Sequence, residues 1–367
     1  MNQQNQKFMR IVQITSGDGY GGTEVHTLQM ASELIKAGHE VIIVVRPGSW
    51  IEQECKAAGL PYKSIRLHGT CDFLAVLRLR LLIWKWGVDI VHGHLFRAAH
   101  YAAMACKHTR AISISTCHST CFHKHLYSSR KIIAVSNAVR ETLINHGCPE
   151  EQIKVILNGV PQAQKIDRHL LRSELGIPSD VFAAVCVGRM DIEKGQKDLI
   201  ETIPTLRENV HLYFIGDTNT EYGQEMLNLS QRHPRIHFMG FRSDVSRVLS
   251  AFDLCVAPTY RDAMPLTLLE ASQAGLPIVA NRVGGIPEIV EENRSGILTT
   301  PSRIDELAEA INRIAGDPAM CKHFGKRASE IYQEKFTLNR MVDSTLTLYG
   351  EILGCPGLRN RNACLAS

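Results

Sequence analysis

Short apolar runs alternate with longer segments of helical periodicity along most of the chain. Each run is nearly continuous, and most are rich in Val, Ile and Ala. Such runs, separated by helices, predict parallel strands that are buried on both faces of a sheet. They lie at residues 10–14, 41–45, 89–92, 112–115, 132–135, 183–187, 211–215, 236–239, 254–256 and 278–280. The predicted fold class is therefore α/β, with the same pattern occurring twice.

A break in this pattern near residues 158–161 separates the two halves. We expect a disordered lead at 1–8, a first doubly wound domain at 9–163 and a second at 164–340. From residue 341 a helix is expected to return toward the first domain, followed by a loose tail to residue 367. In such sheets ligands bind outside the carboxyl ends of the strands, so candidate chemistry is sought in the loops that follow them.

Residues 73–86 are rich in Leu, Arg and Trp and predict a helix. Asp72 is a suitable cap at its start, and Gly87 a suitable stop at its end. The commoner interpretation is a crossover helix on the sheet, whose arginines extend to water. The alternative is a basic amphipathic helix at a membrane surface, and further Lys, Arg and His residues in the first half support it.

Composition narrows the classes of function. The chain is 44% hydrophobic and 21% charged, as soluble globular proteins are, and its net charge of +4 is too small to indicate nucleic-acid binding. The apolar runs are far shorter than the roughly 20 residues of a membrane span, and no signal-peptide core begins the chain. The 11 cysteines then predict reduced thiols in the cytoplasm. Residues 117–125 contain two Cys and three His, but their spacing matches no common zinc pattern, so we expect no metal there.

The most informative segment is 262–270, where two acids flank a predicted helix start. Pro265 suits the first helical position, and Met264 has no oxygen with which to cap the helix. The N–H groups of Leu266 and Thr267 are therefore expected to lack internal partners, and a helix end of this kind attracts phosphate.

The two acids are Asp262, just outside this helix, and Glu270, about one turn inside it. Together with a phosphate-binding helix end they suit a ligand with hydroxyls at both ends and phosphate in the middle, as in a nucleotide-sugar. The alternative is that Asp262 caps the helix and Glu270 is a solvated surface residue.

Other charged and glycine-rich positions also follow predicted strands. Arg189 and Lys194 come after the run at 183–187 and are well placed to neutralise a diphosphate, unless they are simply solvated loop charges. His118 follows the run at 112–115 and is a candidate donor to a sugar hydroxyl or phosphate, although a lone histidine is more often structural. The glycine-rich loop at 17–24 permits close approach of a ligand, or is only a tight turn.

Taken in order, these motifs resemble those of the retaining glycosyltransferases of family 4, which have the GT-B fold. The resemblance extends over roughly residues 9–349. It rests on Gly-Gly-Thr-Glu at 21–24, Asp-Ile-Val-His-Gly-His at 89–94, Thr-Cys-His at 116–118, Ala-Val-Ser-Asn at 134–137, Asn-Gly-Val at 158–160, Gly-Arg at 188–189, Lys-Gly at 194–195, the acids at 262 and 270, and Val-Gly-Gly-Ile-Pro-Glu at 283–288.

The resemblance implies two Rossmann-like domains facing across a cleft, an N-terminal one for the acceptor and a C-terminal one for the nucleotide-sugar donor. It also implies that no metal or other cofactor is needed, because cations and a helix end serve the diphosphate. By this resemblance Arg189 and Lys194 would bind the diphosphate, Glu270 the ribose and Asp262 the transferred sugar. His118 would lie beside the reacting sugar, and Gly21 and Gly22 would border the acceptor and the phosphate. Further donor contacts would come from the backbone of Ala263, Met264, Pro265, Leu266 and Thr267.

The implied function is transfer of a hexose or N-acetylhexosamine from a UDP-sugar to a saccharide or glycolipid, in cell-envelope polysaccharide or lipopolysaccharide biosynthesis. The expected location is the cytoplasm or the inner face of its membrane. One departure is Asp262, where the family usually has glutamate, and it leaves the donor open. The alternatives are a GT-B sugar-nucleotide epimerase and a nucleotide-sugar-binding protein without catalysis. A Rossmann dehydrogenase is the weakest, because the dinucleotide fingerprint is missing.

Overall fold

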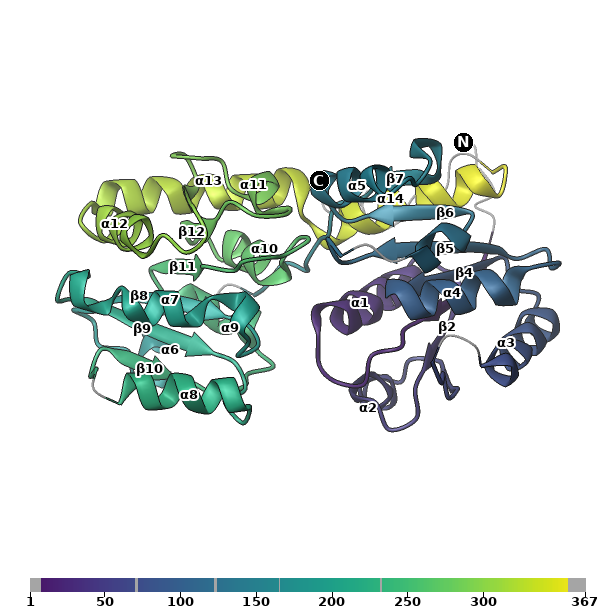
Figure 1. Cartoon of the computed structure of the whole chain (residues 1–367), viewed down its shortest axis with the longest axis horizontal. Helices are drawn as coiled ribbons and strands as arrows, with labels where there is room; N and C mark the ends of the chain where they lie inside the picture. The colour runs from purple at the N-terminus through teal and green to yellow at the C-terminus, as the bar shows by residue number, and fades with distance from the viewer. Residues whose placement is uncertain (1–7, 70–71, 122–123, 165, 232, 356–367) are drawn as a thin grey trace. The chain divides into compact units, whose positions relative to one another are not determined.

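The computed structural model describes residues 8–69, 72–121, 124–164, 166–231 and 233–355 (Figure 1). The chain forms two compact units. Unit 1 comprises Met1–Gly159 and Leu338–Ser367, and unit 2 comprises Val160–Thr337. Nearly all of the lead and tail expected from the sequence lies outside the described residues.

Unit 1 is built on one parallel sheet with the order β3-β2-β1-β4-β5-β6-β7. Its strands are β1 (Arg10–Ile14), β2 (Glu40–Val45), β3 (Tyr62–Ser64), β4 (Ile90–His94), β5 (Ile112–Cys117), β6 (Lys131–Ala134) and β7 (Ile153–Val155). Its α-helices are α1 (Gly22–Lys36), α2 (Trp50–Ala57), α3 (Phe73–Trp86), α4 (Leu95–Cys106), α5 (Asn137–Asn145) and α14 (Leu338–Ile352), with 3-10 turns at η1 (Lys124–Ser128) and η2 (Glu150–Gln152).

The two faces of this sheet form separate cores, because successive strand side chains point to opposite sides. Ile11 belongs to the core that α1, α2 and α14 cover, whereas Val12 belongs to the core under α3 and α4. The last helix, α14, packs against α1, so the chain returns to unit 1 at its end. Burial on both faces explains why the strands are continuous apolar runs.

Unit 2 repeats the architecture with a parallel sheet of order β10-β9-β8-β11-β12-β13. Its strands are β8 (Phe182–Val187), β9 (Val210–Ile215), β10 (Ile236–Phe238), β11 (Leu254–Ala257), β12 (Ile278–Asn281) and β13 (Gly296–Thr299). Its helices are α6 (Arg168–Glu174), α7 (Gln196–Glu201), α8 (Glu221–Ser230), α9 (Val245–Val248), α10 (Leu266–Gln273), α11 (Ile286–Ile289), α12 (Ile304–Ala315) and α13 (Pro318–Lys335), with 3-10 turns at η3 (Ile192–Lys194), η4 (Ile203–Thr205) and η5 (Leu249–Ala251).

The α/β prediction is confirmed, and every predicted strand is present with ends within two residues of those expected. The boundaries of α3 are also confirmed: the Asp72 side chain accepts a hydrogen bond from Ala75 N, and Gly87 ends the helix in the left-handed conformation. Three strands, β3, β7 and β13, were not predicted. No helix in the described ranges combines the length and apolar character that crossing a bilayer requires.

Candidate functional site

The topological switch point of unit 2 lies between β8 and β11, where consecutive connections leave in opposite directions, and ligands of such sheets bind there. Lys194 ends η3 after β8, and Asp262 lies in the loop after β11. The structure brings these two predicted residues together: Lys194 Nζ donates to Asp262 Oδ2 at 2.6 Å, with both side chains largely buried. Neither is a solvated loop charge.

Helix α10 begins at Leu266, with Pro265 in the capping position just before it. The prediction that Pro265 is the first helical residue is therefore wrong by one position, since its ψ of 121° is extended. No side chain among the described residues caps this helix, as predicted, so Asp262 is not a cap. In the described part of the chain the N–H groups of Leu266 and Thr267 have no hydrogen-bond partner, and the next amide, on Leu268, bonds to the Pro265 carbonyl.

Glu270 lies one turn further along α10 and is half-buried rather than solvated. Burial raises the pKa of its carboxyl to about 7, because the charged form loses hydration without a compensating cation. A carboxylate with this environment is ready to accept hydrogen bonds from ligand hydroxyls. A carboxyl whose pKa is raised by burial is also typical of functional sites.

Two glycines allow close contact between backbone segments in the loops around Asp262 and Lys194. A Cβ on Gly284 would lie 1.7 Å from the Asp262 carbonyl oxygen, and Gly285 N donates to that same oxygen at 3.3 Å. A Cβ on Gly195 would lie 2.1 Å from the Pro258 carbonyl oxygen. Both glycines also have positive φ angles, 50° and 67°. These close contacts therefore fix the backbone from which the Asp262 and Lys194 side chains extend.

A buried amide supports the same loop from below. Asn281, at the end of β12, donates through Nδ2 to the carbonyls of Pro258 at 2.8 Å and Thr259 at 3.2 Å. Its Oδ1 accepts from Thr299 Oγ1 at 2.9 Å. Thr259 Oγ1 in turn donates to the Glu193 carbonyl at 2.8 Å, which ties the loop after β11 to the loop after β8. Sequence reasoning missed this network, whose only signal is a polar residue at the end of an apolar run.

Arg189 is the one predicted cation of unit 2 that the structure does not bring into this cluster. Its side chain is 70% exposed, and its nearest ion-pair partner, Asp191, is 4.0 Å away. The buried side chain of Gln196 holds its backbone, donating to the Arg189 carbonyl at 2.7 Å. The guanidinium is thus anchored at its base and extends into solvent. The Glu288 side chain is a first-turn acid of α11.

In unit 1, His118 directly follows β5 and does not stand alone. Its Nε2 lies 3.2 Å from Nδ1 of His94, and its ring also contacts His26. Burial lowers the pKa of His26 to about 4 and those of His94 and His118 well below the ordinary histidine value, so all three imidazoles are neutral at pH 7. Within residues 117–125, the Cys117 thiol is buried and hydrogen-bonded to the Ser119 carbonyl, and residue 123 lies outside the described ranges.

The glycine-rich loop of unit 1 covers a buried acid. Gly21 precedes α1 with extended backbone and Gly22 is its first residue. The Glu24 carboxyl accepts from Thr15 Oγ1 at 3.2 Å, and burial raises its pKa. A Cβ on Gly17 or Gly21 would come within 2.0 or 2.7 Å of the Glu24 oxygens. Packing over Glu24 therefore accounts for Gly17 and Gly21, and the ligand role of Gly21 and Gly22 stays a prediction.

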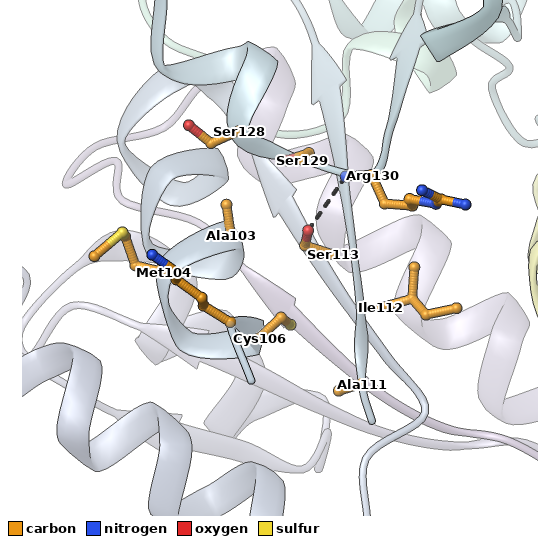
Figure 2. A pocket seen from close by; sticks show the side chains of 10 residues that line it. Ala103, Met104, Cys106, Ala111, Ile112, Ser113, Ser128, Ser129 and Arg130 are labelled. Carbon is orange, nitrogen blue, oxygen red and sulfur yellow. Dashed lines mark hydrogen bonds between the residues drawn. The ribbon is translucent and has the colours of Figure 1, made fainter. Parts of the chain in front are cut away.

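Pockets also occur at the opposite, amino-terminal edges of the sheets. Figure 2 shows one of them, where Ile112 and Ser113 begin β5 and Ser113 Oγ accepts from Arg130 N at 3.3 Å. Another in unit 2 is lined in part by Phe182 and Pro277, at or just before strand starts. Neither is lined by a predicted site residue, and both lie at the strand ends where such sheets do not bind ligands.

Comparison with known proteins defines the class. The family model described as Glycosyltransferase Family 4 matches residues 20–164, and that described as Glycosyl transferases group 1 matches residues 182–317. The fold has solved counterparts: a glycosyltransferase of Rickettsia africae has a TM-score of 0.84 at 23% identity over 94% of this chain and 99% of its own. HepE of Anabaena, in complex with UDP-glucose, has a TM-score of 0.83 at 22% identity over 94% of this chain and 99% of its own. The protein is therefore a glycosyltransferase with the GT-B fold. More particularly, the chain belongs to glycosyltransferase family 4.

Two curated relatives extend over almost the whole chain. An uncharacterized glycosyltransferase of Methanocaldococcus jannaschii is 25% identical, covering 90% of this chain and 94% of its own length. The lipopolysaccharide core biosynthesis glycosyltransferase LpsD of Rhizobium meliloti is 23% identical, with coverage of 93% and 98%. Both relatives belong to the same class of enzyme as this protein. Because these identities are low, the names of the relatives do not assign substrates to this chain.

Proposed function

We propose that the protein transfers a hexose or N-acetylhexosamine from a UDP-sugar to a saccharide or glycolipid acceptor, with retention of configuration. The observation that carries the proposal is the arrangement of Lys194, Asp262, Glu270 and the uncapped α10 at the switch point of unit 2. These groups offer a cation and free amides for a diphosphate and carboxylates for hydroxyls. UDP-glucose bound to HepE supports the choice of nucleotide, and LpsD supports an acceptor of the lipopolysaccharide core type.

Each group has a distinct task in the proposed reaction. Lys194 and the N–H groups of Leu266 and Thr267 bind the diphosphate, with Arg189 closing on it from solvent. Glu270 accepts hydrogen bonds from the ribose, and Asp262 from the transferred sugar. For His118 the proposal keeps the role that the resemblance implies, beside the reacting sugar. No metal is required at the diphosphate, because Lys194 and the helix end supply the positive field.

The proposed step needs no enzyme nucleophile. The acceptor oxygen forms a bond to the anomeric carbon on the face from which the phosphate leaves, the bond between that carbon and the phosphate oxygen breaks, and a phosphate oxygen takes the acceptor proton. Catalysis then consists of positioning and of stabilising charge on the leaving diphosphate. Analysis of the product by NMR tests retention, and an inverted anomeric centre would refute this step.

Substitution of Lys194 and Glu270 by alanine tests the assignment. We expect large losses of transfer with the fold intact by circular dichroism. Lys197→Ala and Glu309→Ala are the matched controls, since both side chains are exposed in the same unit, and transfer should be retained in them. Near-normal transfer in both Lys194→Ala and Glu270→Ala would refute the proposal. A thermal-shift screen with UDP-, GDP- and ADP-sugars first identifies the donor, because bound ligand stabilises by mass action.

The same assays separate the alternatives. An epimerase would release a changed sugar and free nucleotide without a glycoside product, and a binding protein without catalysis would bind the donor and turn over on no acceptor. Asp262→Glu restores the acid that the family usually has. If the shorter arm sets donor choice, this variant will change the order of UDP-sugars in the screen, and an unchanged order would refute that idea.

We also propose that unit 1 contacts an anionic membrane through the outer face of α3. Its inner residues, Ala75, Val76, Leu79 and Ile83, pack in the core, which confirms the crossover interpretation. Its outer face nevertheless exposes large apolar side chains, with Phe73 and Trp84 more than 70% exposed. Exposed Arg78 and Lys85 lie among them, and this mixture is typical of helices in the membrane interface.

Sedimentation with phosphatidylglycerol vesicles tests this contact. We expect binding that falls with salt and is lost in a Phe73→Ser, Trp84→Ser double variant. Leu170→Ser, at an equally exposed apolar position of α6 in unit 2, is the control and should bind like the wild type. Equal binding by the double variant would refute the role of α3, and a change of oligomeric state instead would assign that face to a second copy.

A further inference from the structure

Three histidines from separate segments converge at the switch point of the unit 1 sheet, between β1 and β4. His94 is the last residue of β4, His118 follows β5, and His26 lies in the second turn of α1. One ring nitrogen from each lies within 4.8 Å of those of the other two. The His26 ring centroid is 5.4 Å from that of His94 and 4.7 Å from that of His118.

Several of these nitrogens are buried without a partner. Both ring nitrogens of His26 and Nε2 of His94 have no hydrogen bond within the described ranges of the chain. A buried polar atom left in this way destabilises the fold unless a water or an ion satisfies it.

His92 provides the contrast, two residues before His94 on the same strand. Its Nδ1 and Nε2 each lie 2.6 Å from a hydroxyl, those of Tyr349 and Thr116. This part of the core therefore supplies partners to a histidine whose role is structural. The unpartnered nitrogens of His26 and His94 belong instead to two of the three histidines that face one another.

The spacing suits one metal ion. In a tetrahedral zinc site with Zn–N bonds of about 2.0–2.1 Å, neighbouring nitrogens are about 3.3 Å apart. His94 Nδ1 and His118 Nε2 are 3.2 Å apart, and one His26 ring nitrogen lies within 4.8 Å of a ring nitrogen of each. Three imidazoles with a fourth open position form a known zinc ligand set, and imidazole selects Zn²⁺ over Mg²⁺ or Ca²⁺. We propose that His26, His94 and His118 bind one Zn²⁺ ion.

This site differs from the zinc pattern considered for residues 117–125. Of that segment only His118 takes part, and the Cys117 thiol is committed to the Ser119 carbonyl. It also lies in unit 1, whereas the diphosphate groups of the proposed function all lie in unit 2. The ligands come from positions 68 and 24 residues apart, which no local spacing rule detects.

Titration of the metal-free full chain with Zn²⁺ tests the site by calorimetry, with Co²⁺ as a spectroscopic probe. We expect one ion per chain and at least tenfold weaker binding in His26→Gln and in His118→Gln. His237→Gln is the matched control, because His237 and His211 form a two-histidine pair in unit 2 with nitrogens 3.0 Å apart, and the described residues offer that pair no third ligand. Circular dichroism checks that each variant is folded, and the half-buried His118 serves if His26→Gln is not.

No saturable binding, undiminished binding in both folded variants, or loss of the ion in His237→Gln would each overturn the site. Intense thiolate-to-cobalt bands would also overturn it, since they would move the ion to a cysteine. Because zinc would occupy the His118 imidazole, it should inhibit transfer, an expectation that rests on the proposed function. Zinc bound at one ion per chain with transfer unchanged would refute the role of His118 in transfer and leave the metal site standing.

Discussion

Replacing Glu270 by glutamine should stabilise unit 2 and weaken nucleotide binding at the same time. The pKa of this carboxyl rises from 4.5 to about 7 in the folded state because burial penalises its charge. A shift of one unit corresponds to 1.36 kcal/mol, so the ionised form destabilises the folded state by about 3 kcal/mol. Glutamine has nearly the same shape and carries no charge, so it removes this cost.

The sign of the pH dependence follows from proton binding. Between pH 4.5 and about 7 the folded state holds a proton on Glu270 that the unfolded state has released. The free energy of unfolding therefore falls as the pH rises through this window and is flat above it. The advantage of Glu270→Gln over the wild type should grow by about 3 kcal/mol between pH 4 and pH 8.

The position of the tryptophans provides an internal control for this measurement. All 3 tryptophans, Trp50, Trp84 and Trp86, lie in unit 1. Tryptophan fluorescence during urea unfolding thus reports unit 1 and should show no difference between variant and wild type. Far-ultraviolet circular dichroism reports both units and should show the gain. A gain that is equal at pH 4 and pH 8 would refute the raised pKa.

Titration of the wild type and Glu270→Gln with UDP tests the predicted loss of nucleotide binding. A hydrogen bond to a charged acceptor contributes about 1.5–3 kcal/mol, so Glu270→Gln should weaken UDP binding about 10- to 100-fold at pH 8. In the wild type, UDP affinity should fall as the pH drops below 7 and Glu270 takes up its proton. Unchanged UDP affinity in Glu270→Gln would refute the proposed contact between Glu270 and the ribose.

Three further substitutions test the supports of the sites. Gly284→Ala would place a Cβ 1.7 Å from the Asp262 carbonyl oxygen, so it should abolish transfer and lower the melting temperature. Gly240→Ala is the control: Gly240 has a positive φ angle but open space around it, so the free energy of unfolding in urea should fall by only about 1–2 kcal/mol. Asn281→Leu leaves buried carbonyls unpaired and should destabilise unit 2 by about 2–4 kcal/mol, measured by urea unfolding; a loss below 1 kcal/mol would refute the network. Gly93→Ala would meet the backbone of α4 at 2.5 Å and should lower the melting temperature of unit 1, and a wild-type value would contradict this.

The sequence predicted the interior of both sheets and missed most of their edges. All predicted strands carry continuous apolar runs because both faces are covered. The three that were not predicted, β3, β7 and β13, each lie at the end of a sheet order. Edge strands are short and partly exposed, so Lys63 and Ser64 in β3 and Lys154 in β7 give no hydrophobic signal.

For the candidate site, the role of Glu270 stays a prediction. Residue type and position after a strand were sufficient to predict that Lys194 and Asp262 lie together. Their shared location follows from topology, since carboxyl ends of neighbouring parallel strands meet. Two features depend on three-dimensional contacts that no local pattern encodes. Asn281 is separated by more than 20 residues from the carbonyls that it holds, and His26 approaches His94 from another element.

The ion pair between Lys194 and Asp262 gives the proposed donor site a preference of its own. Without ligand the two charges satisfy each other at 2.6 Å, so a diphosphate must compete with the Asp262 carboxylate for the ammonium. A nucleotide without sugar leaves that carboxylate unpaired when it takes Lys194, whereas a complete donor supplies sugar hydroxyls to it. The pair therefore disfavours the product nucleotide relative to the donor and aids product release. Glutamate at this position is one methylene longer, so in the proposed site we expect aspartate to set this balance as well as the choice of sugar.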